Sequence, residues 1–377
     1  MRRLVQIILL KPILWASKKF ASRPQRDRIF KALTDLLKNI KEAPGKKGIT
    51  LELSASNRYI IFSDQHRGAK DGADDFAVAE PNYMAALDYY YKNDFSFISL
   101  GDSEELWENS LTRVKKHNAE SFEAEKKFIQ QKRFYKVFGN HDLYWVNDPL
   151  AWWQLKKIYG HEVKVYEGVV LNFSDKFLNS GETNDVPAPI TPNSKLSIFL
   201  THGHQGDASS DGNWFSKFFV ARIWAPLQAY LKINPNTPAY DEEMKTGHNH
   251  IMYEWSAEQN NLILITGHTH QPVFESLTHL ERLYKQLQKA TAAGDAELMS
   301  KLHAEIKMRD KNFTPDHPLI PDLKPSYFNS GCCCFSDGDC TGIEISAGTI
   351  SLIKWSKEQG RELLEQASLA ELQLRFN

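Results

Sequence analysis

The feature that most constrains the fold of this chain is one pattern that occurs five times: a short apolar run is followed at once by a polar turn. Each run has the length and composition of a buried strand, and each turn contains Asp, Asn or His. Open α/β sheets carry their chemistry at the carboxyl ends of the strands, so the pattern predicts that these turns converge. The runs are 59–62, 95–100, 134–138, 196–200 and 262–265, and the turns are Ser63-Asp64-Gln65-His66, Gly101-Asp102, Gly139-Asn140-His141-Asp142, Thr201-His202-Gly203-His204 and Thr266-Gly267-His268-Thr269-His270.

Helical segments alternate with the first three runs, at 80–92 and in the charged stretch from 104 past 131. A strand-helix-strand-helix-strand order predicts an α/β fold with parallel pairing and right-handed crossovers. A chain of 377 residues is long enough for one large domain with insertions.

Composition shifts divide the chain into five predicted parts. A main domain of 49–275 and 326–356 follows a basic amphipathic segment and linker at 1–48, and a helical tail at 357–377 ends the chain. Within the domain, 205–261 is an aromatic-rich insertion, predicted to be partly core and partly cap. A second insertion at 276–325 predicts an antiparallel helical hairpin with helices at 276–289 and 296–309 and Asp295 as an N-cap. Strands at 327–335 and 341–355 are expected to pair as a hairpin that closes the sheet.

Charge and cysteine content limit the environment. A formal net charge of −1 provides no global basic field, so no nucleic-acid partner is expected.

No apolar run reaches eighteen residues, so no membrane-spanning helix is expected. Three adjacent cysteines cannot form an ordinary disulfide framework, which favours buried thiols in a reducing, cytoplasmic compartment. For the basic N-terminal segment two interpretations stay open: a helix packed on the core, or peripheral contact with the inner membrane surface. The cysteines are Cys332, Cys333, Cys334 and Cys340.

The polar turns together offer a set of metal ligands. Carboxylate and amide oxygens mixed with imidazoles suit Mn, Fe or Zn better than Ca. Seven ligands are too many for one ion with an open position, but they suit two divalent ions bridged by one carboxylate. Such a pair holds the attacking and leaving oxygens of an in-line displacement. The seven are Asp64, His66, Asp102, Asn140, His202, His268 and His270.

In type and order the five turns resemble the signature of the calcineurin-like metallophosphoesterases, which reads Asp-x-His, Gly-Asp, Gly-Asn-His-(Asp/Glu), His-Gly-His and Gly-His-x-His. The turn Tyr327-Phe328-Asn329-Ser330-Gly331 is similar to the Asn-Pro-Gly-Ser turn of that family. The resemblance implies a four-layer α/β/β/α sandwich with helical insertions. It also implies hydrolysis of a phosphoester or pyrophosphate bond by a hydroxide that bridges two metal ions.

The resemblance also implies a role for each matching residue. Asp64, His66 and His270 would bind the first ion. Asn140, His202 and His268 would bind the second, and Asp102 would bridge the two. His141 would donate a proton to the leaving oxygen or stabilise phosphoryl charge, and Asp142 would orient it. His204 is open between substrate contact and loop packing, and His248 and His250 are weaker substrate-side candidates.

The resemblance leaves the substrate open between phosphorylated small molecules and lipid-linked compounds. The block from Gly101 to Trp107 is similar to the Gly-Asp-x-x-Asp-x-Trp block of the branch related to UDP-2,3-diacylglucosamine pyrophosphohydrolases, with Glu105 in place of the second Asp. The basic N-terminus and the aromatic insertion also suit an acylated substrate, although that branch usually carries Arg where this chain has His141. A different class is a metal-retaining scaffold that binds a partner through the hairpin at 276–309.

Overall fold

The structure is a computed structural model that describes residues 24–54, 56–72, 74–173, 196–206, 242–309 and 321–376. In these ranges no helix is long and apolar enough to cross a lipid bilayer.

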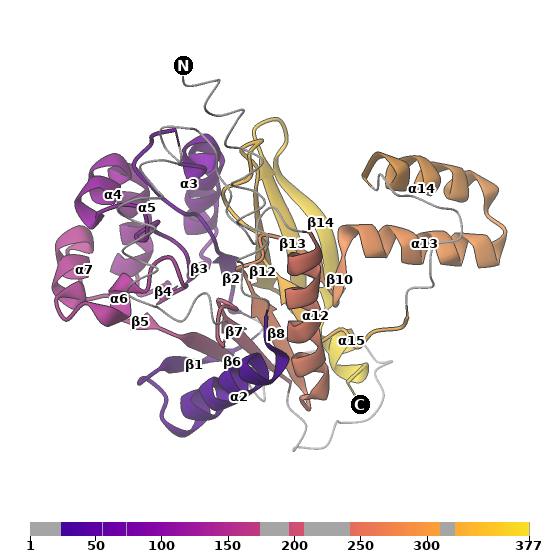
Figure 1. The fold of residues 1–377 in the computed structure, drawn as a ribbon, viewed down its shortest axis with the longest axis horizontal. Helices are drawn as coiled ribbons and strands as arrows, with labels where there is room; N and C mark the ends of the chain where they lie inside the picture. The colour runs from indigo at the N-terminus through magenta and orange to yellow at the C-terminus, as the bar shows by residue number, and fades with distance from the viewer. Residues whose placement is uncertain are drawn as a thin grey trace.

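Two mixed β-sheets form the centre of the molecule, and in the described ranges each contains seven strands (Figure 1). Apolar side chains of both sheets, such as Ile61 and Ile263, interdigitate in one buried cluster. The first sheet has the order β1 (Gly48–Leu53), β6 (Gly168–Phe173), β7 (Ser197–Thr201), β8 (Leu262–Thr266), β11 (Tyr327–Asn329), β9 (Val273–Phe274) and β10 (Leu277–Thr278). The second has the order β14 (Gly360–Ser368), β13 (Thr349–Ser356), β12 (Cys340–Ser346), β2 (Tyr59–Phe62), β3 (Ser96–Leu100), β4 (Phe134–Val137) and β5 (Val165–Tyr166).

The parallel half of the second sheet confirms the predicted strand and helix order. β2, β3, β4 and β5 pair in parallel. The helix α3 (Phe76–Lys92) connects β2 to β3, and α4 (Leu111–His117) and α5 (Ala119–Gln130) connect β3 to β4. Along β2 every side chain is buried, and successive side chains face opposite ways. Ile61 lies in the cluster between the sheets, whereas Ile60 and Phe62 lie in the cluster under α3.

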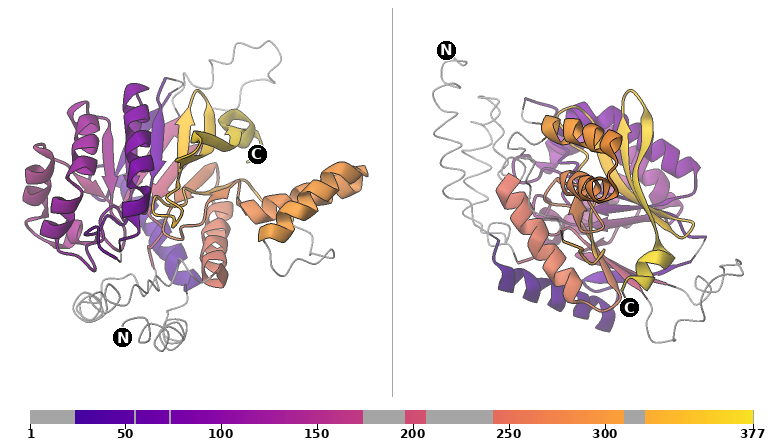
Figure 2. Two further views of the ribbon diagram at one scale, coloured as in Figure 1. Left: turned by 90° about the horizontal axis from the view of Figure 1, so that it is seen from above. Right: turned by 90° about the vertical axis from the view of Figure 1, so that its right-hand side faces the viewer.

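Helices cover the outer face of each sheet and complete the four layers that the resemblance implies (Figure 2). On the second sheet, Tyr83 of α3 and Phe128 of α5 pack with Phe97. On the first sheet, Leu33 of α2 (Arg26–Glu42) and Trp255 of α12 (Glu242–Glu258) pack with Phe199. The helices α6 (Tyr144–Asn147) and α7 (Ala151–Tyr159) pack beside α5 in a smaller cluster.

The hairpin insertion has the two predicted helices, α13 (His279–Ala293) and α14 (Ala296–Arg309), which project from the domain (Figure 1). A capping box of Thr278 and Glu281 begins α13. Asp295 is the predicted N-cap, since its Oδ1 accepts the Leu298 N–H at 3.0 Å. The two helices bury their own apolar stripe, which includes Leu287 and Ile306.

The strands near the C-terminus differ from two predictions. The 327–335 run does not pair with 341–355, because β11 adds to the first sheet beside β8. The 341–355 run contains a hairpin of its own, β12 and β13. The tail at 357–377 is mainly a strand, since β14 extends this hairpin before the short helix α15 (Leu369–Leu374). The polar composition of the tail favours a helix, but the free backbone groups at the edge of β13 pair with it and stabilise a strand instead.

Two predicted segments lie partly outside the described residues. Of 1–48, the described part contains α2, which packs on the first sheet. Of the insertion 205–261, the range 207–241 lies outside the described residues. The range 242–258 is α12, where Met252 and Trp255 are buried, so this part belongs to the core and not to a cap.

Candidate metal centre

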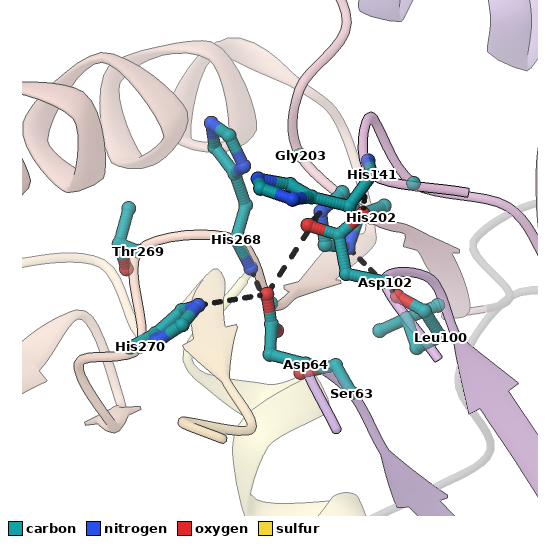
Figure 3. Close-up of polar contacts among 12 residues, drawn as sticks. Ser63, Asp64, Leu100, Asp102, His141, His202, Gly203, His268, Thr269 and His270 are labelled. Carbon is teal, nitrogen blue, oxygen red and sulfur yellow. Dashed lines mark hydrogen bonds and ion pairs between the residues drawn. The ribbon is translucent and has the colours of Figure 1, made fainter. Parts of the chain in front are cut away.

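The five polar turns converge at one edge of the two sheets, as the strand pattern predicts. β2, β3 and β4 are parallel neighbours in one sheet, and β7 and β8 are parallel neighbours in the other, so their carboxyl ends meet. Figure 3 shows Asp64 and Asp102 between the histidines of the last two turns. Asp64 Oδ1 lies 3.3 Å from His270 Nε2, and Asp102 Oδ2 lies 3.1 Å from His202 Nε2.

The converging side chains fall into two groups of potential ligands. Asp64, His66 and His270 form one group, in which the ligand atoms lie within 4.8 Å of one another. Asp102, His202 and His268 form the other. Asp102 Oδ2 also lies 3.8 Å from His66 Nε2 of the first group, which is the position of a shared carboxylate.

Unpaired polar atoms show that the donor set fits divalent cations. Asp64 Oδ1, Asn140 Oδ1 and His202 Nε2 are buried and form no hydrogen bond of normal geometry with the described residues. A buried acceptor without a hydrogen bond costs about 1–3 kcal/mol. Asp64 Oδ1 and His202 Nε2 do lie near His270 Nε2 and Asp102 Oδ2, and these close contacts among potential ligand atoms fit a site for a positive ion. Oxygen donors mixed with imidazole nitrogens match Mn, Fe or Zn.

The backbone at these turns is unusual. Five of the seven predicted ligands have positive φ angles, a region that residues other than glycine seldom occupy. Such residues are held there only by the packing around them, and they cluster at functional sites. The five are Asp64 (53°), His66 (49°), Asp102 (51°), His268 (69°) and His270 (56°).

Two glycines of the motifs permit the close approach of the carboxylates. A Cβ atom added at Gly139 would overlap Asp102 Oδ1, and one added at Gly267 would overlap Asp64 Oδ2. These glycines therefore leave room for the carboxylates beside the neighbouring turns.

The ring nitrogens that point away from the centre have their own partners. His202 Nδ1 lies 2.9 Å from the carbonyl oxygen of Leu100, and His66 Nδ1 lies 3.0 Å from Glu105 Oε2. Both acceptors require a hydrogen on Nδ1, which leaves Nε2 as the ligand atom. The tautomer and the ring orientation are thus set before any ligand binds.

Glu105 holds a second ring at this site. The same Oε2 lies 2.7 Å from His141 Nδ1, and the His141 ring stacks on Trp107 with 4.8 Å between ring centroids. The backbone N–H of His141 donates to Asp102 Oδ1 at 2.8 Å. Glu105 was not among the predicted site residues. The signal for it was its place in the Gly101–Trp107 block, three residues after Asp102.

Asp142 is placed differently from its expected role. Its carboxylate accepts the N–H of Gly139 at 2.5 Å and the N–H of Ser103 at 3.0 Å. These bonds connect the turns after β3 and β4, and the side chain that orients the His141 ring is Glu105. Burial raises the pKa of Asp142 to about 6.

The remaining histidines line the side of His202 and His268. His204 is buried, and burial followed by the charge of His202 lowers its pKa to about 3. His248 of α12 lies with Nε2 2.9 Å from the carbonyl oxygen of Gly203, and its ring lies 5.2 Å from that of His268. His250 is exposed and pairs with Glu254, away from the centre.

Opposite charges shift the pKa values of the central groups. Burial opposes ionisation of Asp102, but His202 and His141 outweigh it and lower its pKa well below the usual value. Burial also opposes protonation of His202, but Asp102 and Asp64 raise its pKa to about 9. The carboxylates are therefore anionic at neutral pH, as ligation requires.

A buried ion network lies beneath the site. Arg67 donates to Glu125 at 2.7 Å and to Glu104 at 2.5 Å, and Lys136 pairs with Glu104 at 3.0 Å. All four side chains are fully buried. The network connects the turns after β2 and β3 to β4 and α5, and it was not predicted from the sequence.

The fold and the converging ligand groups are those of a metal-dependent phosphoesterase, and a comparison of sequences agrees. The family model described as calcineurin-like phosphoesterase matches residues 58–272, more than half of the chain, and the chain belongs to this family. It is a metal-dependent phosphoric ester hydrolase. No curated protein sequence matches the chain.

Similar solved structures are distant. A predicted phosphoesterase from Streptococcus pneumoniae TIGR4 is 14% identical, with 83% of this chain and 99% of that chain covered and a TM-score of 0.27. Vacuolar Protein Sorting 29 from Cryptosporidium parvum is 12% identical, with 84% of this chain and 100% of that chain covered and a TM-score of 0.33. A mutant cold-active protein tyrosine phosphatase is 9% identical, with 84% of this chain and 82% of that chain covered and a TM-score of 0.31.

Proposed function

We propose that this hydrolase cleaves a phosphoester or pyrophosphate bond at the edge where the five turns meet. The observation that carries the proposal is the pair of ligand groups that share Asp102. Two divalent ions bound there would lower the pKa of a bound water molecule and would stabilise the negative charge of the phosphoryl oxygens. Asp64, His66 and His270 would hold the first ion, Asn140, His202 and His268 the second, and Asp102 both.

His141 is the proposed proton donor to the leaving oxygen. Glu105 accepts from its Nδ1, and Trp107 fixes the plane of the ring. Nε2 is then the atom that can give a proton to the leaving oxygen or stabilise phosphoryl charge. Burial lowers the pKa of His141, but the carboxylates of Glu105 and Asp102 outweigh it and raise the pKa above the ordinary value, which favours the protonated form of the donor.

The test is turnover by the full chain supplied with Mn²⁺, Fe²⁺ or Zn²⁺ and an aryl phosphomonoester or phosphodiester. We expect turnover that Asp102→Asn and His268→Ala reduce by at least about 100-fold, because the first replaces the bridging carboxylate with a neutral amide and the second removes an imidazole ligand. Absence of turnover with every metal, or turnover unchanged in both variants, would instead support the scaffold interpretation. That interpretation has little support in the hairpin, whose apolar stripe is already buried between α13 and α14.

Four exposed apolar side chains support a lipid-linked substrate as the finer candidate. Val146, Leu150, Trp152 and Trp153 follow Asp142 within eleven positions of the chain and are 39–60% exposed. Lys157 Nζ lies 3.5 Å from the centre of the Trp153 ring. Tryptophan and lysine side by side are typical of surfaces that contact lipid headgroups.

Direct assay separates this candidate from a water-soluble substrate. We expect the protein with Mn²⁺ to release UMP from UDP-2,3-diacylglucosamine, and His141→Ala to release little. UMP at the level of the His141→Ala control would exclude this substrate and leave the phosphoesterase proposal standing. Sedimentation of the natural chain and of the Trp152→Ala variant with anionic vesicles tests the proposed membrane contact independently of the substrate.

The compartment and the metal also remain proposals. The four cysteines are free thiols, which supports a reducing, cytoplasmic location. Manganese is our first choice of metal because most of the oxygen donors are carboxylates.

A further inference from the structure

The cysteines near the C-terminus divide into two pairs with different surroundings. All four are free and buried. Cys334 Sγ lies 3.8 Å from His270 Nδ1, and Cys332, Cys334 and His270 bring their ligand atoms within 4.8 Å of one another. Cys340 Sγ instead lies 3.7 Å from the carbonyl oxygen of Ala79, in the core under α3.

His270 stands between these thiols and the proposed centre. Its Nε2 lies 3.3 Å from Asp64 Oδ1 and 3.1 Å from His66 Nε2, so this nitrogen belongs to the first ligand group. Its Nδ1 points to sulfur. The outer nitrogens of His202, His66 and His270 meet three kinds of group: a carbonyl at His202, a carboxylate at His66 and a thiol at His270.

The loop that carries the thiols is fixed to the turn that carries Asp64. The backbone N–H of Cys333 donates to the carbonyl oxygen of Asp64 at 3.2 Å, and the hydroxyls of Ser63 and Ser330 lie 2.8 Å apart. The backbone N–H of Thr341 donates to the carbonyl oxygen of Cys332 at 2.9 Å. The sulfur atoms are therefore held at a set place relative to the first ligand group.

We propose that Cys334, supported by Cys332, is a positioning residue for the first ion: its sulfur accepts the Nδ1 hydrogen of His270 and directs Nε2 toward Asp64 and His66. The inference rests on the proposed dinuclear function. Partners of ligating histidines typically change metal affinity or activity by about 10–100-fold when removed. Since sulfur is a weak hydrogen-bond acceptor, we expect removal of Cys334 to weaken metal binding by about tenfold, the lower end of this range.

The experiment measures Mn²⁺ binding to the metal-stripped full chain by calorimetry, so it does not depend on turnover. Cys334→Ala should weaken binding of one ion about tenfold. Cys334→Ser retains an acceptor of similar size and should restore most of the affinity. Cys340→Ala removes a buried sulfur that lies in the core under α3, and this variant should bind Mn²⁺ like the natural chain.

The outcomes distinguish this inference from the proposed function. If the natural chain binds Mn²⁺ and Asp102→Asn does not, the proposed function stands. Unchanged affinity in Cys334→Ala would then overturn the positioning role alone, as would equal losses in the Ala and Ser variants. If the natural chain binds no Mn²⁺, both proposals fail.

A spectroscopic measurement provides a second test of the positioning role. We expect Co²⁺ at this site to show ligand-field bands without sulfur-to-cobalt charge transfer. A charge-transfer band that Cys334→Ser abolishes would show that the thiolate is itself a ligand, and would overturn the positioning role.

Discussion

Asp102 is the residue on which both ligand groups depend. Its Oδ2 lies 3.1 Å from His202 and 3.8 Å from His66, and its Oδ1 accepts the backbone N–H of His141. One carboxylate thus contacts three of the five turns, and Gly139 leaves the space that it needs. A carboxylate that bridges two ions must lie next to both ligand groups, and Asp102 does.

Glu105 is the residue-scale feature with the clearest kinetic consequence. Because one oxygen holds both His66 and His141, Glu105→Ala should lower kcat/KM about 10–100-fold while the protein stays folded. The measurement is steady-state turnover of an aryl phosphoester, with circular dichroism as a check of the fold. Glu123→Gln, on the exposed side of α5, is the control and should leave the rate unchanged. Equal rates for Glu105→Ala and the control would contradict the orienting role.

Glu104 should make stability depend on acid pH. Burial raises its pKa, but Lys136 and Arg67 outweigh burial and lower it below the ordinary value of 4.5. Because the folded pKa is the lower one, the contribution to stability is complete above the unfolded pKa and is lost as the pH falls toward the folded pKa. Urea unfolding between pH 7 and pH 3 should show a free energy that declines below about pH 4.5.

The matched variant for this pH dependence is Glu104→Gln. It should be less stable at pH 7 by about 3–5 kcal/mol, since Lys136 and Arg67 lose a buried partner. Its decline toward pH 3 should be shallower than that of the natural chain. Parallel pH profiles for the two proteins would assign the acid sensitivity to other groups.

At the scale of elements, α2 and α12 form one outer layer through a few contacts. Trp255 of α12 is 1% exposed, packs on Phe199 and donates its indole N–H to Thr34 of α2 at 3.0 Å. Arg26 of α2 also pairs with Glu254 of α12. The segment before the main domain is therefore part of the folded core where it is described.

Trp255→Ala should destabilise the protein by about 3–5 kcal/mol, because it leaves a cavity under both helices. Trp152→Ala, which truncates a tryptophan that is 60% exposed, should change stability by less than about 0.5 kcal/mol. Denaturant unfolding of the two variants provides the comparison. Similar losses in both would mean that α12 does not pack as described.

At the scale of the whole molecule, the two sheets bring strand ends from distant parts of the chain to one site. The proposed ligands extend from Asp64 to His270 in the sequence, so an ion bound there would connect both sheets. Ligands that bind only the folded state stabilise it by mass action. The metal centre is thus expected to contribute to the stability of the whole domain.

Chelation should therefore remove activity and lower the melting temperature together. Mn²⁺ returned at 100 times its dissociation constant should restore about 2.7 kcal/mol for each ion bound. Differential scanning calorimetry with stepwise Mn²⁺ addition measures this. A melting temperature that does not respond to Mn²⁺, while Asp102→Asn melts like the natural chain, would contradict a metal centre between the sheets.

The sequence by itself determined the strand-and-turn order, the parallel half of the second sheet and the converging ligand candidates. These are local properties: an apolar run, the turn after it and the residue types in that turn lie within a few positions of one another. Only the tertiary structure decided that β11 joins the first sheet, that β14 is a strand, that Glu105 holds two histidines and that Cys334 meets His270 across 64 positions of the chain. Strand pairing and side-chain partnership between distant segments depend on which surfaces the packed layers bring together, and no local pattern carries that information.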